Sequence, residues 1–154
     1  AIELWALAGG LLLVAVILMN VYSLATGHLI GKPLPGDFEM VEIGVAVAAF
    51  AFLPYCQLTG AHVSADVFTQ GAGPRLKTAL ALFGALIGLV FSAVLLWRMS
   101  LGLGDQIGYG ETTAIMSIPI WWAYVPIVAS LALLVVAAVV SLIDALAEMR
   151  QTAH

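Results

Sequence analysis

Charged residues are scarce in this chain, and their scarcity excludes most soluble folds. Only 9% of its 154 residues are charged, whereas 63% are hydrophobic, and the mean hydropathy is +1.11. A soluble domain carries roughly 25% charged residues. A soluble fold with so few charges could not cover its surface with polar groups, so we expect lipid to be the solvent for much of this chain.

Basic residues and cysteines are also few. Lys and Arg together number five and the net charge is -4, so the sequence offers no basic patch for nucleic acid. The single cysteine, Cys56, excludes an internal disulfide and a metal site built from several cysteines. We expect Cys56 to be a small buried apolar residue.

Four apolar runs are each long enough to cross a bilayer, which takes about 20 residues. They cover about residues 4–24, 39–58, 76–97 and 119–143. The first run is too long for the core of a signal peptide and lacks a basic start, so we expect it to be a span. The sequence therefore predicts an all-α integral membrane protein, in which residues 1–154 form one bundle of four transmembrane helices.

The segment between the second and third runs is expected to hold a short interfacial helix. Pro54 predicts a kink or an early end of the second run, because proline removes one backbone hydrogen bond and clashes with the preceding turn. In residues 59–73, Val63 and Phe68 could face lipid while His62 and Asp66 face water or protein.

Four spans place both chain ends on one side of the membrane. If that side is cytoplasmic, three basic residues lie inside and two outside, which favours this orientation by the positive-inside rule. The inner ones are Arg75, Lys77 and Arg150, and the outer ones are Lys32 and Arg98. Trp5 at the inner end of the first run and Trp121 at the outer start of the fourth are typical of the aromatic belts.

The histidines do not suggest a cofactor site. A haem held by two histidines needs both ligands at one depth, but His28 and His62 follow successive spans and His154 lies in the tail. No phosphate-binding loop, zinc motif or nucleophile elbow is present either. We therefore predict no catalytic residue, cofactor or metal site. The alternative is a membrane anchor or cytochrome-type subunit of a redox enzyme. A small exporter is a third possibility, but it would need an ionisable residue deep in a span, which this sequence lacks.

Two acidic residues share a face at the start of the second run. Glu39 and Glu42 are three residues apart, and negative charge is favourable at a helix N-terminus, so both could simply be solvated. Alternatively, Glu42 forms an ion pair with Arg98, because antiparallel neighbours bring the start of the second span near the end of the third.

Small residues recur four apart in two of the runs. Gly84 and Gly88 form a GxxxG motif in the third run, and Gly44 and Ala48 repeat the spacing in the second. Lipid gives helices no hydrophobic reason to associate, so small residues that let backbones approach mark packing faces. The motif predicts close packing without identifying the partner.

Two stretches resemble one family. PGDFEMVEIGVAVAAFAFLPYCQLTGAHVSADVF (35–68) and GYGETTAIMSIPIWWAYVPI (108–127) are similar to the small membrane subunit of tripartite ATP-independent periplasmic (TRAP) transporters, the DctQ-like family. In the first stretch the matching residues are Gly36, Glu39, His62 and Asp66. In the second they are Gly110, Thr113, Pro119, Trp121 and Tyr124.

The resemblance implies a role in a bacterial or archaeal cytoplasmic membrane. Such a subunit is a fixed, non-catalytic scaffold for a large membrane subunit that carries the substrate and sodium sites and moves as an elevator. A soluble periplasmic binding protein delivers an organic acid, which the sequence does not identify.

Two polar segments fit such a role. The connections 26–38 and 100–117 would help receive the binding protein through Lys32, Asp37, Asp105 and Glu111, unless these charges only keep the loops hydrated. We further expect His62 and Asp66 to orient the short helix at the cytoplasmic interface, or else to be merely solvated.

Overall fold

The computed structural model describes the backbone of residues 2–68, 71 and 73–152, and the side chains of these residues except 60–68, 74 and 152. Within them the chain forms four helices, which are α1 (Ile2–Ile30), α2 (Asp37–Phe68), α3 (Pro74–Tyr109) and α4 (Trp121–Thr152). Each helix is long and apolar enough to cross a membrane. The prediction of an all-α protein with four transmembrane helices is therefore confirmed.

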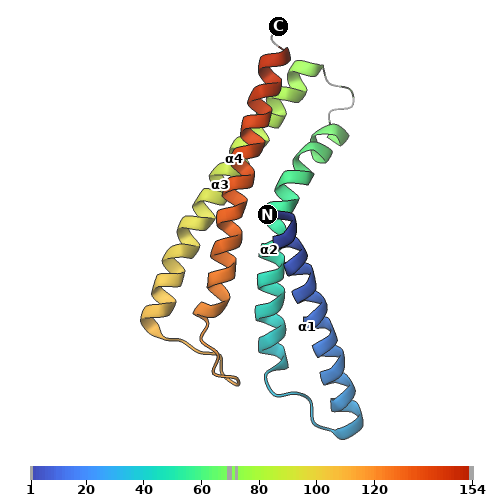
Figure 1. Ribbon diagram of the computed structural model, residues 1–154, viewed down its shortest axis with the longest axis vertical. Coiled ribbons are helices and arrows are strands. Elements are labelled where there is room, and N and C mark those ends of the chain that lie inside the picture. The colour runs from blue at the N-terminus through green and yellow to red at the C-terminus, as the bar shows by residue number, and fades with distance from the viewer. Residues whose placement is uncertain (1, 69–70, 72, 153–154) are drawn as a thin grey trace.

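The helices pack as two antiparallel pairs joined at the centre. α1 packs on α2, α3 packs on α4, and α2 also packs on α4, whereas α2 and α3 touch over a small area. Figure 1 shows the result, with α2 and α4 between α3 on one side and α1 on the other.

The hydrophobic core is built on α4. Ile127, Leu131 and Leu134 form its centre. Partly buried residues of α2 and α3 pack against them, namely Ala46, Val47, Phe50, Leu95, Leu96 and Met99. In α4 33% of the most apolar stretch is buried, against 11% in α3. Small residues explain this central place, since Ala137 and Ala138 are fully buried and let neighbouring helices approach closely.

All four helices extend beyond the predicted spans, α1 as far as Ile30 and α2 as far as Phe68. α3 continues from the predicted end near 97 to Tyr109, so most of the predicted loop 100–117 is helical, and α4 continues from 143 to Thr152. Tertiary packing explains the extension of α3: a Cβ on Gly102 would lie 3.2 Å from Cε1 of Tyr124, so the glycine permits close contact with α4. α3 ends at Tyr109, and Gly110 caps it with a left-handed φ of 63°, which suits glycine.

The separate interfacial helix predicted for 59–73 is not shown. α2 instead continues through Pro54 as far as Phe68. Pro54 is fully buried, and its packing offsets the lost backbone hydrogen bond. Cys56, expected to be buried, is exposed. Exposure costs such an apolar side chain little in a membrane protein, because lipid is as apolar as the interior.

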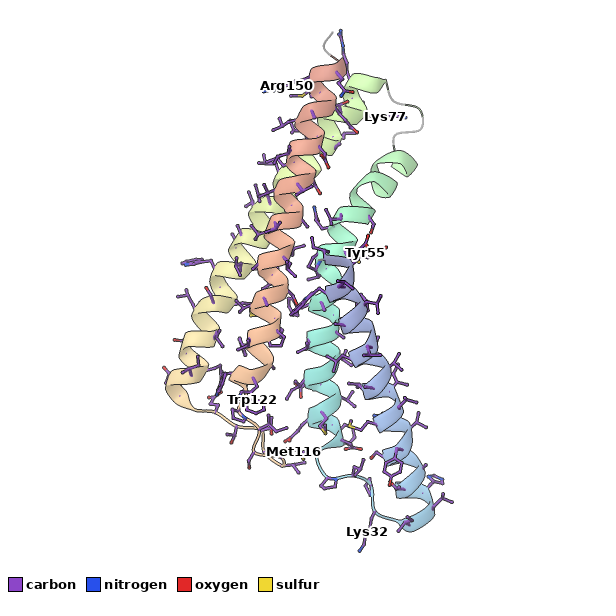
Figure 2. The ribbon with its side chains drawn as sticks, in the orientation of Figure 1. Lys32, Tyr55, Lys77, Met116, Trp122 and Arg150 are labelled. Atoms are coloured by element: carbon purple, nitrogen blue, oxygen red, sulfur yellow. The ribbon has the colours of Figure 1, made fainter. Side chains whose placement is uncertain are left out.

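The two helix pairs are displaced along the bundle. Figure 1 shows that α1 begins level with the middle of α4 and extends toward the two connections 31–36 and 110–120. We call the end with these connections the two-loop end, where Lys32 and Met116 lie in Figure 2. Lys77 and Arg150 lie at the opposite end. The two-loop end corresponds to the outer side in the predicted orientation.

Candidate functional site: the two-loop end

A carboxylate at the start of α2 holds the connection between α3 and α4. Glu39 accepts hydrogen bonds from the backbone N–H groups of Ile115, at 2.8 Å, and of Met116, at 3.0 Å. These residues are more than 70 positions away in the chain, so one side chain joins the two helix pairs. A carboxylate suits this task because it offers two acceptor oxygens and no donor.

The connection that Glu39 holds is an ordered hairpin, residues 111–120. Thr112 and Pro119 form an antiparallel bridge, and the Thr113 N–H donates to the Ile118 carbonyl at 2.9 Å. The Thr113 hydroxyl also accepts the Ile118 N–H, at 3.1 Å. Ser117 adopts a left-handed φ of 53°, which lets the chain reverse within five residues of Thr113. The Ile115 and Met116 amides at the tip then point at Glu39.

Gly36 lets the hairpin come this close. Its φ of 79° lies in the left-handed region, which favours glycine. A Cβ at this position would collide with the Met116 side chain, lying 2.9 Å from its Sδ and closer still to Cγ. Any other residue would therefore be strained in its backbone, and its Cβ would displace the Met116 side chain.

A second polar contact fixes the connection between α1 and α2. The buried Ser23 hydroxyl donates to Oδ2 of Asp37 at 2.7 Å and accepts the Leu34 N–H at 3.2 Å. The other carboxylate oxygen of Asp37 accepts the Phe38 N–H at 2.8 Å. Asp37 thus holds the start of α2, which is a structural task.

The four predicted docking residues do not form one cluster. Lys32 and Glu111 are exposed in the two connections, while Asp105 is exposed on α3, not in a loop. Asp37 is half-buried and held by Ser23. No hydrogen bond or ion pair joins these four residues to one another in the described chain. Three of them are therefore exposed on the surface of the chain.

The structure does not bring Glu42 and Arg98 together. Both side chains are exposed, and no ion pair joins them over the described residues. The reason is the helix order, because α2 packs mainly on α1 and α4 and only slightly on α3. The polar task at the start of α2 falls instead to Glu39, one turn earlier.

The small residues of the two spaced motifs differ in surroundings. Gly44 and Ala48 are buried where α2 meets α1, and a Cβ on Gly44 would collide with Val16. Gly84 is exposed and a Cβ there would meet nothing within 4 Å. Gly88 instead faces the Gln57 side chain, whose Nε2 would lie 2.9 Å from such a Cβ.

Sequence reasoning missed a polar link in the apolar part of the bundle. The Trp5 indole N–H donates to the Ser130 hydroxyl at 2.9 Å, and Ser130 donates to the Pro126 carbonyl at 2.7 Å. Trp5 thus ties α1 to α4. The sequence gives no signal for the pair, because 125 positions separate its members.

The backbone of His62 and Asp66 lies in the last part of α2, but their side chains are outside the described set. Over the described residues, no group of three or more His, Cys, Asp or Glu side chains is placed to hold a metal ion. The two-loop end offers hydrogen-bonding groups and exposed charges.

Comparison with known families identifies the family of this chain. The model of the family described as tripartite ATP-independent periplasmic transporters, DctQ component, matches residues 12–148. The chain belongs to the DctQ family. No curated protein and no solved structure matches it. As a DctQ component, the chain is part of a multi-component transporter of the cytoplasmic membrane. Membership in this family implies association with a large membrane subunit and a substrate-binding protein.

The contact between Glu39 and the hairpin joins the two stretches that resemble the DctQ family. Gly36 and Glu39 come from one stretch that resembles the family, and Thr113 comes from the other. The structure brings the two stretches into one hydrogen-bonded unit. In this DctQ chain the two stretches therefore share a structural purpose, which is to fix the hairpin on α2.

Proposed function

We propose that this DctQ chain is the small, non-catalytic scaffold subunit of a TRAP transporter. In this role it supports a large membrane subunit that carries the substrate and sodium sites during uptake of an organic acid. The observation that carries the proposal is the family match over residues 12–148, nearly the whole chain. The chain itself has only to hold a shape and present surfaces.

The way the helices are tied together supports a scaffold role. Glu39 links the two helix pairs at the two-loop end, α2 packs on α4 at the centre, and Trp5 links α1 to α4. These attachments, one at the two-loop end and two near the centre of the bundle, resist movement of one pair against the other. A support for a moving partner requires this resistance.

The exposed surface supports association with a further membrane protein. Only 17% of the most apolar stretch of α1 is buried within the chain, so most of this helix faces outward. Lipid can cover such a surface, and so can the helices of a larger subunit. Affinity purification through this chain, from membranes that contain the large subunit, tests the proposal. Recovery of the large subunit supports it, whereas a chain that purifies alone and transports substrate unaided refutes it.

We further propose that the two-loop end helps receive the periplasmic binding protein. The hairpin is held by Glu39, and three exposed charges lie in or near the two connections, namely Lys32, Asp105 and Glu111. Exposed charges steer a soluble partner without binding it tightly, and salt screens them over roughly 8 Å at physiological ionic strength. Docking should therefore weaken as salt is raised.

Charge reversal distinguishes docking from folding. Lys32→Glu, Asp105→Lys and Glu111→Lys should each raise the binding-protein concentration needed for half-maximal uptake and leave assembly intact. Asp37→Lys serves as the contrast, because it breaks the contact with Ser23 and should reduce the amount of assembled complex. Wild-type behaviour of all three accessible variants would exclude these charges from docking.

A further inference from the structure

An open, mostly apolar groove runs along the α1–α2 pair. One face of α1 from Glu3 to Val14 forms most of it, and Phe52 and Tyr55 of α2 complete it. The described residues of α3 and α4 take no part in its lining. Figure 2 shows Tyr55 beside the beginning of α1, at mid-height of the bundle.

The groove is preformed because the opposite face of α1 is fixed. Gly9 packs so closely on α2 that a Cβ there would lie 2.7 Å from Cβ of Ala51. Trp5 is held by its hydrogen bond to Ser130. On the groove side Gly10 leaves room, since an added Cβ would meet only the Phe52 ring, at an ordinary 3.6 Å. Small residues of this kind let a further helix backbone approach.

The groove ends at a carboxylate that nothing within its lining neutralises. Glu3 is exposed, and the residues lining the groove include no Lys, Arg or His. Its neighbour Trp5 bonds Ser130, which lies nine residues into α4, about 13 Å from the start of that helix at 1.5 Å per residue. Glu3 is therefore level with the apolar part of α4, where a charge without a partner among the described residues is costly.

The position of Glu3 in the first turn of α1 has a simple local benefit, because negative charge is favourable at a helix N-terminus. That benefit does not explain an open groove beside it. From Glu3 to Val14 the groove spans about 16 Å, or three helical turns. An acyl chain would also fill the apolar part, so lipid is the alternative occupant that the crosslinking experiment below separates from a helix.

We propose that this groove receives a transmembrane helix of the large subunit, whose basic side chain pairs with Glu3. The inference rests on the proposed function, because it takes the large membrane subunit as the partner. The proposal specifies the contact face, which is α1 with the edge of α2. It also specifies the chemistry of the contact, in which one basic side chain pairs with Glu3 and an apolar helix face fills the rest of the groove.

Two glycines offer a matched test in the assembled transporter. Gly10→Leu fills the groove, whereas Gly84→Leu adds the same side chain to an open surface of α3. After purification through this chain, Gly10→Leu should retain at least about fivefold less large subunit, while Gly84→Leu stays within about twofold of wild type. Glu3→Lys should reduce retention more than Glu3→Gln. If Gly10→Leu retains as much large subunit as wild type, or if only Gly84→Leu loses it, the groove is not the contact site.

A photo-crosslinker keeps the test valid if Gly10→Leu fails to fold. Placed at Leu7 in the groove it should label the large subunit, and placed at Val90 on the exposed face of α3 it should not. Labelling of lipid alone from Leu7 overturns the proposal. If the unmodified chain retains no large subunit at all, the proposed function itself is wrong. This result differs from the two that exclude only the groove, which come from the Gly10→Leu variant and the Leu7 crosslink.

Discussion

Gly44 and Gly84 occupy equivalent positions in two similar motifs, yet the structure predicts opposite responses to an added methyl group. Gly44→Ala would place Cβ against the Val16 side chain, colliding with Cγ2 and lying 3.6 Å from Cβ. Val16 is itself buried, and its branched side chain has little rotational freedom with which to yield. Gly84→Ala meets nothing within 4 Å.

The magnitude follows from two contributions. Replacing glycine by alanine inside a helix favours folding by up to about 1 kcal/mol, and this gain applies to both variants. Overpacking a close contact costs about 1–3 kcal/mol and applies only to Gly44→Ala. We therefore expect Gly84→Ala to be neutral or slightly stabilising, and Gly44→Ala to be less stable than Gly84→Ala by about 1–3 kcal/mol.

Equilibrium unfolding in mixed micelles, titrated with sodium dodecyl sulfate and followed by tryptophan fluorescence, measures the free energy of unfolding of both variants. Circular dichroism of the starting samples controls for loss of helix. Equal unfolding free energies would show that α1 does not pack on Gly44, and would remove the basis for treating α1 and α2 as one rigid pair.

Three further predictions concern polar contacts. Glu39→Ala should speed hydrogen exchange of the hairpin amides 115 and 116. Glu39→Gln should have an intermediate effect, because its amide retains one acceptor oxygen. Unchanged exchange rates would show that Glu39 does not hold these amides. A double-mutant cycle of Trp5→Phe and Ser130→Ala should give a coupling of about 0.6 kcal/mol, the average for hydrogen bonds between membrane helices, and zero coupling would deny that link. Asp37→Asn should lower thermal stability more than Glu111→Gln, because only Asp37 is held by a buried hydroxyl; equal shifts would contradict this assignment.

The helices themselves could be predicted from the sequence, because long apolar runs are a strong local signal. Their ends could not. Gly102 looks like a loop residue, but its close contact with Tyr124 allows α3 to continue past it. Pro54 looks like a helix end, but its burial keeps α2 continuous. In both cases packing against another helix overrides the local preference, and a local pattern carries no information about that neighbour.

The polar contacts were harder to predict for a related reason. Glu39 and Glu42 look equivalent in the sequence, and the choice between them depends on where the hairpin lies. The partners of Glu39 are backbone N–H groups, which every non-proline residue has. The types of side chain in the sequence therefore do not reveal these partners. Likewise, a GxxxG spacing identifies small residues without saying which helix, if any, will use them.

The central claim is that this chain supports transport without carrying it out. Uptake into proteoliposomes that contain the large subunit, with the binding protein outside and this chain either present or left out, tests it most directly. We predict that uptake requires both membrane subunits, and that vesicles holding this chain alone take up nothing above background. Full uptake without the chain, or uptake by the chain alone, would contradict the claim.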